Sequence, residues 1–401
     1  MSNESTFGSF TYGEATVSEK LEQISGHSSR LVELSKTVGS FLLRYDYLAI
    51  PTLVNSHSIR LKLPKSTPTN SNILVFPKGS GKSVFLSDII SKHNDGMVIN
   101  RSDIHHEYML MNRADEEFDH KIWICDDLVV TLAGLEAGRQ RNQLTGFYTA
   151  ILSKGEYERD GVQNQFSGMR KIEDAVICCQ YGLASEYFRT ERKQLFNNTL
   201  LDRMIPIYAH LSDDDARAII RATIKRSSSI DIVDPPNLKL TELDGEPIHI
   251  KIDSSIDGLI EDAAITLYHA TGLAPGRAAS YINNFVSSNA LLNDRKIADI
   301  DDMEVWEFIQ DMHLPYSEGS ARASVLHLLA SSTTHIDNSG GVMPLTTKDL
   351  ATRLGEHYQT IAAVMFELRE EGTVHWDRID RGEYIYWLGS ASGKNESKYQ
   401  R

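Results

Sequence analysis

Short apolar runs alternate with stretches of helical periodicity in the middle of the chain. The runs are continuous rather than alternating, which is typical of strands in a parallel sheet that is covered on both faces. Five runs follow this pattern: ILVF (73–76), MVIN (97–100), KIWICDD (121–127), AVICCQ (175–180) and RMIPIY (203–208). We therefore expect an α/β domain in which helices separate five parallel strands.

The flanking regions have other patterns. Apolar residues recur at helical spacing from Val17 to Leu48, and the polar stretch 63–72 reads as a linker. A second polar stretch, 227–237, precedes a mainly helical region that ends near Leu314, and the residues after Leu388 have the polar composition of a disordered tail. The pattern predicts five parts: an N-terminal helical segment with its linker (1–70), an α/β core (71–211), a helical region (212–316), a small end domain (317–388) and a tail (389–401).

The composition is ordinary for a globular protein, with 41% hydrophobic and 24% charged residues among 401. A net charge of −14 argues against a surface built throughout to coat nucleic acid, although it leaves room for a local basic patch. The three cysteines, Cys125, Cys178 and Cys179, lie inside apolar runs and form no C-x-x-C pair, which suits a reducing compartment. No apolar segment is long enough for a membrane span, so we expect a cytoplasmic protein.

The first apolar run leads into FPKGSGKS (76–83), which is close to the phosphate-binding pattern G-x-x-x-x-G-K-[ST]. Glycines let backbone N–H groups curl around phosphate oxygens, and a helix N-terminus adds partial positive charge. The lysine would reach the β- and γ-phosphates of ATP, and the serine hydroxyl would ligate Mg²⁺. The predicted nucleotide-binding residues of the loop are Pro77, Lys78, Gly79, Ser80, Gly81, Lys82 and Ser83.

Phe76 stands where this pattern has its first glycine. That glycine begins the turn and does not cradle phosphate, so we expect a loop that binds ATP but starts differently. A strand-to-helix turn that merely contains glycines is the structural alternative.

The third apolar run ends in two carboxylates, Asp126 and Asp127. Carboxylates at this place suit Mg²⁺ binding by Asp126 and activation of the attacking water by Asp127. A buried strand with an acidic end is the alternative.

Taken in order, the strand–loop–helix, the sequence ICDD, a fourth strand ending in Gln180 and the stretch LLDRMIPI resemble the AAA+ ATPase superfamily of P-loop NTPases. The resemblance implies that Gln180 orients the lytic water as sensor 1 and that Arg203 enters the active site of a neighbouring subunit. Such an arginine can raise the rate roughly 10³–10⁵-fold. Most relatives have Glu in place of Asp127, and the shorter side chain predicts slow hydrolysis. The implied assembly is a homo-oligomer, either a hexameric ring or a filament; for Arg203, a surface arginine is the alternative.

The stretch 276–309, which begins GRAASYINNF, is similar to the lid of the minichromosome maintenance (MCM) helicases. This resemblance implies a helical lid over 212–316, with Arg277 as sensor 2 on the γ-phosphate; a helix-opening arginine paired with a carboxylate is the alternative. The stretch 153–171 lies where these ATPases insert a hairpin into the channel of the ring. Arg159, Arg170 and Lys171 could there face DNA phosphates, and a solvent-exposed hairpin is the alternative.

The end domain reads as a winged helix, with helices near 323–332, 346–355 and 356–372 and a β-hairpin around the sequence DRG. In such a DNA reader the third helix enters the major groove and the wing touches phosphate, which assigns DNA contacts to Gln359, Arg378 and Arg381. Because the third helix is acidic near its end, a protein-contact module is the alternative.

These patterns predict a P-loop NTPase (AAA+) fold with a parallel sheet, a helical lid and a C-terminal winged helix. The predicted function is that of a DNA-associated ATPase in replication: initiation, helicase loading or MCM-like translocation, with other replication proteins as further partners. Only about 70 residues precede the loop and none is a zinc-binding cysteine, which argues against processive unwinding. Two alternatives stay open: a transposition-type regulator that polymerises on DNA, and a non-hydrolytic ATP-gated scaffold whose winged helix binds protein.

Overall fold

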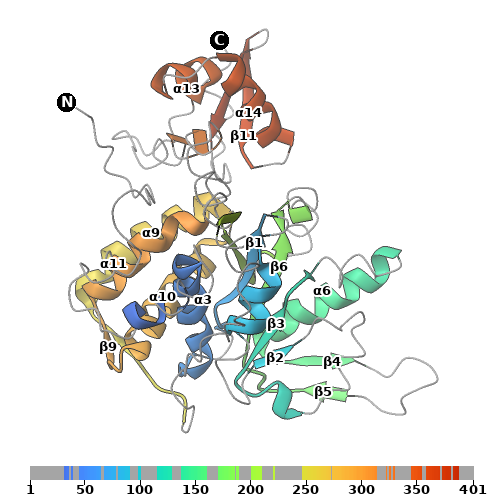
Figure 1. The fold of residues 1–401 in the computed structure, drawn as a ribbon, viewed down its shortest axis with the longest axis vertical. Coiled ribbons are helices and arrows are strands. Elements are labelled where there is room, and N and C mark those ends of the chain that lie inside the picture. Colours follow the sequence, from blue (N-terminus) through green and yellow to red (C-terminus); the bar gives the residue numbers. More distant parts are fainter. Residues whose placement is uncertain are drawn as a thin grey trace.

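A five-stranded parallel sheet forms the centre of the molecule (Figure 1). Its strand order is β2–β3–β6–β1–β7, with β1 Ser71–Phe76, β2 Val98–Asn100, β3 Lys121–Cys125, β6 Ile177–Ala184 and β7 Met204–Tyr208. The five predicted strands and their parallel pairing are thus confirmed. This computed structural model describes residues 31–35, 38, 45–64, 67–77, 80–90, 98–100, 115–128, 137–159, 170–185, 187–188, 200–209, 220–221, 246–271, 273–313, 322, 325–326, 328–329, 345–354, 358–370, 373–380 and 383–387.

Alternate residues of each strand enter two different hydrophobic cores, one on each face of the sheet. On β1, Leu74 and Phe76 face one core, whereas Ile73 and Val75 face the other. The adjacent cysteines of β6 divide in the same way, Cys178 to the first core and Cys179 to the second. This burial on both faces explains why the strands read as continuous apolar runs.

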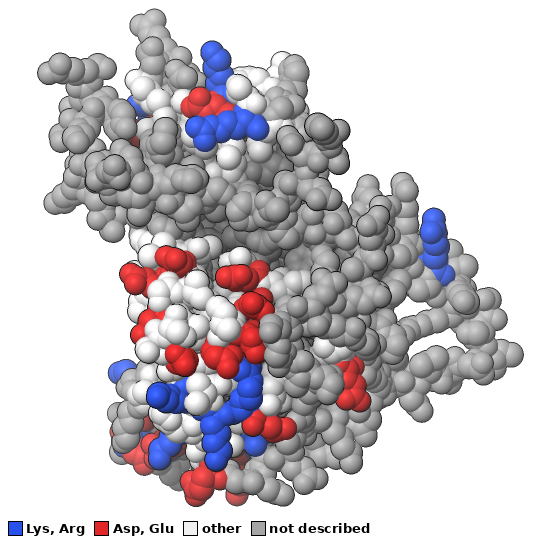
Figure 2. Space-filling model, turned by 90° about the vertical axis from the view of Figure 1, so that its left-hand side faces the viewer, with Lys and Arg blue, Asp and Glu red and all other residues white. Residues whose placement is uncertain are grey.

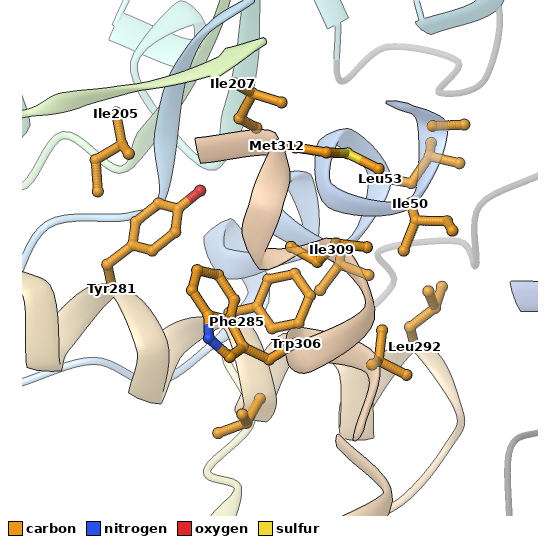
Figure 3. Packing of buried hydrophobic residues seen from close by; sticks show 14 of the residues in the cluster. Ile50, Leu53, Ile205, Ile207, Tyr281, Phe285, Leu292, Trp306, Ile309 and Met312 are labelled. Carbon is orange, nitrogen blue, oxygen red and sulfur yellow. The ribbon is translucent and has the colours of Figure 1, made fainter. Parts of the chain in front are cut away.

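The first core joins the sheet to helices from both ends of the α/β region. These elements are α3 Asp46–Ser56, η1 His57–Arg60, η2 Val84–Ile90, η5 Ser254–Ile256, α9 Asp257–Thr271, α10 Pro275–Leu292, α11 Ile300–Ile309 and η6 Gln310–His313. Figure 3 shows Trp306 of α11 packed beside Phe285 of α10, with Ile205 and Ile207 of β7 across the core. The N-terminal helix, the sheet and the helical region therefore share one core. The second core packs α6 Ala137–Lys154 on the opposite face.

The expectation that 63–72 is a linker is wrong for its last residues. Asn70, Ser71 and Asn72 are buried, and the last two belong to β1. Their polar groups are paired: the Asn55 and Asn72 amides both donate to the Tyr281 hydroxyl at 2.7 Å, and Asn70 Nδ2 donates to the Tyr281 carbonyl at 2.9 Å. Hydrogen bonding makes burial of these amides tolerable, and the network links α3, β1 and α10.

Smaller elements complete the described α/β part. A short helix, η4 Asp115–Glu117, precedes β3. An antiparallel pair, β4 Tyr157–Arg159 with β5 Arg170–Ile172, follows α6. A two-stranded parallel ladder, β8 Lys251–Ile252 with β9 Ile297–Ala298, flanks the helical region.

The C-terminal residues form a module with its own hydrophobic core. Helices α13 Thr347–Leu354 and α14 Tyr358–Glu370 pack on a three-stranded antiparallel sheet of order β10–β12–β11, with β10 Leu345–Thr346, β11 His375–Asp380 and β12 Glu383–Trp387. Thr346 and Asp349 cap α13 reciprocally through side chain and backbone. The expected second and third helices and the hairpin are therefore present.

Charge is unevenly distributed over the helical part. Figure 2 shows acidic side chains gathered on one area of that face and basic ones gathered below them. The exposed residues of this part include Asp257, Glu261 and Asp262 on α9, and Lys251 and Lys296 on β8 and beside β9. Within the described part of the chain, none of the helices has the length and apolarity that crossing a membrane would require.

Candidate nucleotide site

The loop after β1 turns sharply into a helix. Gly81 has φ 94°, a left-handed value that favours glycine, and its carbonyl accepts a hydrogen bond from the Phe85 N–H at 3.0 Å. Ser80 Oγ donates to the Pro77 carbonyl at 2.7 Å and closes the turn. The expected helix begins at Lys82, but Val84–Ile90 is a π-helix rather than an α-helix. Lys78 and Gly79 lie outside the described residues, so their predicted phosphate contacts stay predictions.

The buried ring of Phe76 supports the start of this loop. Its ring is fully buried between Tyr45 and Phe85, with ring centroids 5.7 and 6.0 Å away. The Tyr45 hydroxyl donates to the Ser80 carbonyl at 2.6 Å, and burial raises the pKa of Tyr45 to about 12. Phe76, which replaces the first glycine, is thus one of three packed aromatic rings that support the loop. Sequence reasoning missed Tyr45 because no local pattern links it to a loop 35 residues later.

Lys82 reaches across the sheet to the acidic end of β3. Its Nζ lies 3.0 Å from Asp127 Oδ2, with the two side chains 14% and 39% exposed. Strand β6 lies between β1 and β3, and Gly182 of β6 leaves room for the lysine to pass. A Cβ at Gly182 would lie 2.8 Å from Lys82 Cδ and from the Asp126 carbonyl oxygen. Gly182 therefore permits the contact between the loop and the carboxylate.

Ser83 and Asp126 have the donor chemistry that Mg²⁺ prefers. Ser83 is exposed in the first turn of the helix after the loop, and Asp126 directly follows β3 and is half-buried. No group of three or more His, Cys, Asp or Glu residues suited to a metal occurs among the described residues. A hydroxyl and a carboxylate that share the remaining positions with water and phosphate would suit Mg²⁺, which keeps several such ligands.

Gln180 does not lie at the edge where its role was expected. Strand β6 continues to Ala184, and Gln180 is level with Asn72, four residues before the end of β1. Its side chain is fully buried, with Nε2 3.2 Å from Asn72 Oδ1 and 3.2 Å from Cys178 Sγ. The expected strand end is wrong because Tyr181–Ala184 extend the pairing with β1. Gly182, which has no side chain, stands near the edge instead.

Arg203 and Arg277 lie together at the opposite, amino edge of the sheet. Arg203 Nη1 is 3.5 Å from the Asp202 carboxylate, and Arg277 Nη1 donates to the Asp202 carbonyl at 3.2 Å. Arg203 Nε also donates to Ser153 Oγ at 2.8 Å. Partial burial and then the nearby charge of Arg277 lower the pKa of Arg203. In the part of the chain that the structure describes, these two arginines lie beside one carboxylate, and such a concentration of positive charge suits an anion.

This amino edge also contains a cavity. Its volume is about 540 Å³, and its lining includes Thr69, His120, Ser153, Gly155 and Ala175. The cavity lies next to Arg203 through Ser153, and it is separate from the loop at the carboxyl edge.

The predicted DNA-contact residues are partly described. Arg159 and Arg170 are paired across β4 and β5, but their side chains lie outside the described set. Lys171 is exposed and forms an ion pair with Glu173, and this hydrogen bond raises the pKa of Lys171. In the C-terminal module, Gln359 and Arg378 are exposed on α14 and β11, whereas Arg381 lies outside the described residues.

No protein-family model matches the sequence, and no curated protein is significantly similar to it.

Proposed function

We propose that the protein binds and hydrolyses ATP in the manner of the AAA+ ATPases. The contact that carries the proposal is the one between Lys82 and Asp127 at the carboxyl edge, where ligands of open α/β sheets commonly bind. The strand order is further support, because it places the loop-bearing β1 inside the parallel sheet, between β6 and β7. The two strands that carry the loop and the acids are separated only by β6.

Each polar residue at this edge would have its own role in ATP binding and hydrolysis. Lys82, freed from Asp127 by an incoming polyphosphate, would neutralise the β- and γ-phosphates. Ser83 and Asp126 would hold Mg²⁺, which supplies positive charge to the phosphates. Asp127 would then polarise the attacking water. Because Gln180 is buried elsewhere, no side chain of β6 is proposed to help orient that water, and hydrolysis is expected to be slow.

The position of the arginines supports an ATP site shared between copies. Five residue steps of β1 span about 17 Å, so Arg203 and Arg277 cannot serve the loop of their own chain. In a ring or filament the amino edge of one copy would face the loop of the next. Both arginines, not Arg203 alone, would then act on the neighbour's γ-phosphate.

DNA is the proposed partner of the assembled protein, in replication initiation, helicase loading or translocation. The β4–β5 pair supports a hairpin that could reach DNA in a ring, with Arg159 and Arg170 at the far ends of its described strands. The C-terminal module has the two helices and the hairpin of a winged helix. The three cysteines are buried thiols, which suits the cytoplasm.

A non-hydrolytic ATP-gated scaffold is the second candidate. The observation that favours it is that Gly182, near the carboxyl end of β6, has no side chain that could orient the attacking water.

Subunit mixing tests the proposal. Lys82→Ala and Arg203→Ala should each abolish turnover, but a mixture should regain it, because some interfaces pair an intact loop with an intact arginine. Arg353→Ala, which changes an exposed arginine of α13, is the matched control and should keep full turnover. A mixture as inactive as its components, although wild-type protein turns over ATP, would exclude a shared site. Absence of turnover in wild-type protein that still binds ATP would favour the scaffold.

A further inference from the structure

An exposed aromatic patch distinguishes the C-terminal module. Four of the eight large hydrophobic residues that are exposed in the described chain belong to it: Tyr358, Phe366, Trp376 and Ile379. Phe366 on α14 and Trp376 on β11 are 57% and 46% exposed. Exposed apolar groups that cluster on a small unit commonly mark an interaction site.

Arg369 holds this patch together. Its guanidinium carbon lies 5.1 Å from the ring centroids of both Phe366 and Trp376, and 5.6 Å from that of Tyr384. Trp376 and Tyr384 meet edge to face at 5.3 Å. These contacts restrain the rings before any partner arrives, which reduces the entropy cost of binding. We name Phe366, Arg369, Trp376 and Tyr384 the aromatic patch.

The rim of the aromatic patch is acidic on the α14 side, where the exposed charged side chains are Glu367 and Glu370. On β11, the exposed Arg378 lies opposite Tyr384 and shares its face, whereas Asp377 lies opposite Ile385 on the other face. Arginines do pair with two of the carboxylates, but the carboxylates face the solvent. Glu367 is 59% exposed beside Arg322 at 20%, and Glu370 is 64% exposed beside Arg369 at 21%.

This charge pattern disfavours DNA on the outer face of α14. The one basic residue of this helix, Arg369, is 21% exposed and is held by Glu370 and the rings, so the helix offers little positive charge to phosphates. An apolar anchor flanked by basic residues would complement both the rings and the carboxylates.

We propose that the aromatic patch binds a protein partner through a short segment that has an aromatic or leucine anchor next to Lys or Arg. The proposal is independent of the ATP site at the sheet, because it rests on the module alone. It assigns α14 to protein contact and leaves DNA to other parts of the chain.

The test is selection of a phage-displayed library of random peptides on the full-length protein, followed by titration of the enriched peptides as synthetic labelled probes. We expect enriched peptides to share an aromatic or leucine anchor and a basic residue. The double variant Phe366→Ser/Trp376→Ser should weaken their binding at least tenfold. Ile265→Ser, which removes an apolar residue of α9 that is 43% exposed, is the matched control and should bind normally.

A second variant keeps the rings and reverses the rim. Glu367→Lys/Glu370→Lys should lose the basic peptides and shift enrichment toward acidic ones. The proposal fails if no peptide is enriched or if enriched peptides bind the double serine variant as well as wild type. It also fails if the double serine variant, with an unchanged melting temperature, loses binding of a labelled single- or double-stranded oligonucleotide instead.

Discussion

At the carboxyl edge of the sheet Lys82 meets Asp127, whereas at the amino edge Arg203 meets Arg277 beside Asp202. The first edge has a balanced pair and a glycine-containing turn, and we propose that it accepts a phosphate chain by exchanging one anion for another. At the second edge, two arginines lie beside one carboxylate, Asp202, among the described residues. Under the proposed function, each copy would carry two unlike halves of an ATP site, which would be complete only where copies meet.

The largest expected effect separates these halves directly. Lys82→Ala should abolish ATP binding, because it removes the loop-edge cation that lies 3.0 Å from Asp127 Oδ2 and would neutralise the phosphates. Arg277→Ala should leave ATP affinity of dilute protein within about twofold but lower the turnover of assembled protein roughly 100-fold, as expected for a lost transition-state donor. Equilibrium binding of a fluorescent ATP analogue and steady-state phosphate release measure the two effects. Equal loss of affinity in both variants would place Arg277 on its own chain's nucleotide.

The next effect concerns the packing behind the amino edge. His313 is fully buried against Trp306, its Nδ1–H donates to the Pro206 carbonyl, and burial lowers its pKa from 6.5 to about 4. The folded state thus binds the proton less readily than the unfolded state, so stability is complete above pH 6.5 and is lost as the pH falls toward 4. At up to about 1.4 kcal/mol per pH unit, the total loss is about 3 kcal/mol.

Urea unfolding between pH 4 and 7.5 measures this dependence. His313→Gln should be less stable at pH 7.5 and should have a flatter profile below pH 6.5. A wild-type profile with no slope difference from the variant would show that His313 does not couple to folding.

Gly182→Ala should perturb the carboxyl edge alone. The new Cβ would meet the Asp126 carbonyl at 2.8 Å, and backbone cannot move aside as a flexible side chain can. We expect a loss of about 1–3 kcal/mol of stability by overpacking, together with weaker ATP binding. The exposed Gly258→Ala on α9, where a Cβ would meet nothing, is the control. Unchanged ATP affinity in Gly182→Ala would mean that Lys82 does not need this passage.

A smaller effect is expected when the hydrogen bond between Tyr45 and the loop is removed. Tyr45→Phe keeps the ring between Phe76 and Phe85 but removes the hydrogen bond to the Ser80 carbonyl. The loss should be about 1 kcal/mol, seen as a several-fold weaker affinity for ATP with little change in the melting temperature. If the variant binds ATP with wild-type affinity, the conformation of the loop depends on the packed rings and not on the Tyr45 hydroxyl.

The outcomes along the sequence follow from what each pattern can encode. Runs such as KIWIC predict strands well, because a strand buried on both faces needs apolar residues at every position. Asn70, Ser71 and Asn72 read as a linker because their burial depends on partners such as Tyr281, more than 200 residues away. The order of motifs assigned Lys82 and Asp127 to one predicted site, and the structure has their side chains 3.0 Å apart. That order could not place Arg277, whose position depends on how α10 packs against the amino edge.

The smallest expected effect tests the corrected position of Gln180. Its Nε2 donates to Asn72 Oδ1, but that oxygen also accepts from Asn55 Nδ2 at 3.0 Å, and Gln180 Oε1 has no hydrogen-bond partner among the described residues. Gln180→Met should therefore conserve volume and leave no acceptor unpaired, with a stability change within about 1 kcal/mol. Turnover should stay within about twofold of wild type, because the side chain lies roughly 13 Å of strand below the loop edge. A large loss of turnover with unchanged stability would mean that Gln180 does act in catalysis and that β6 shifts when ATP binds.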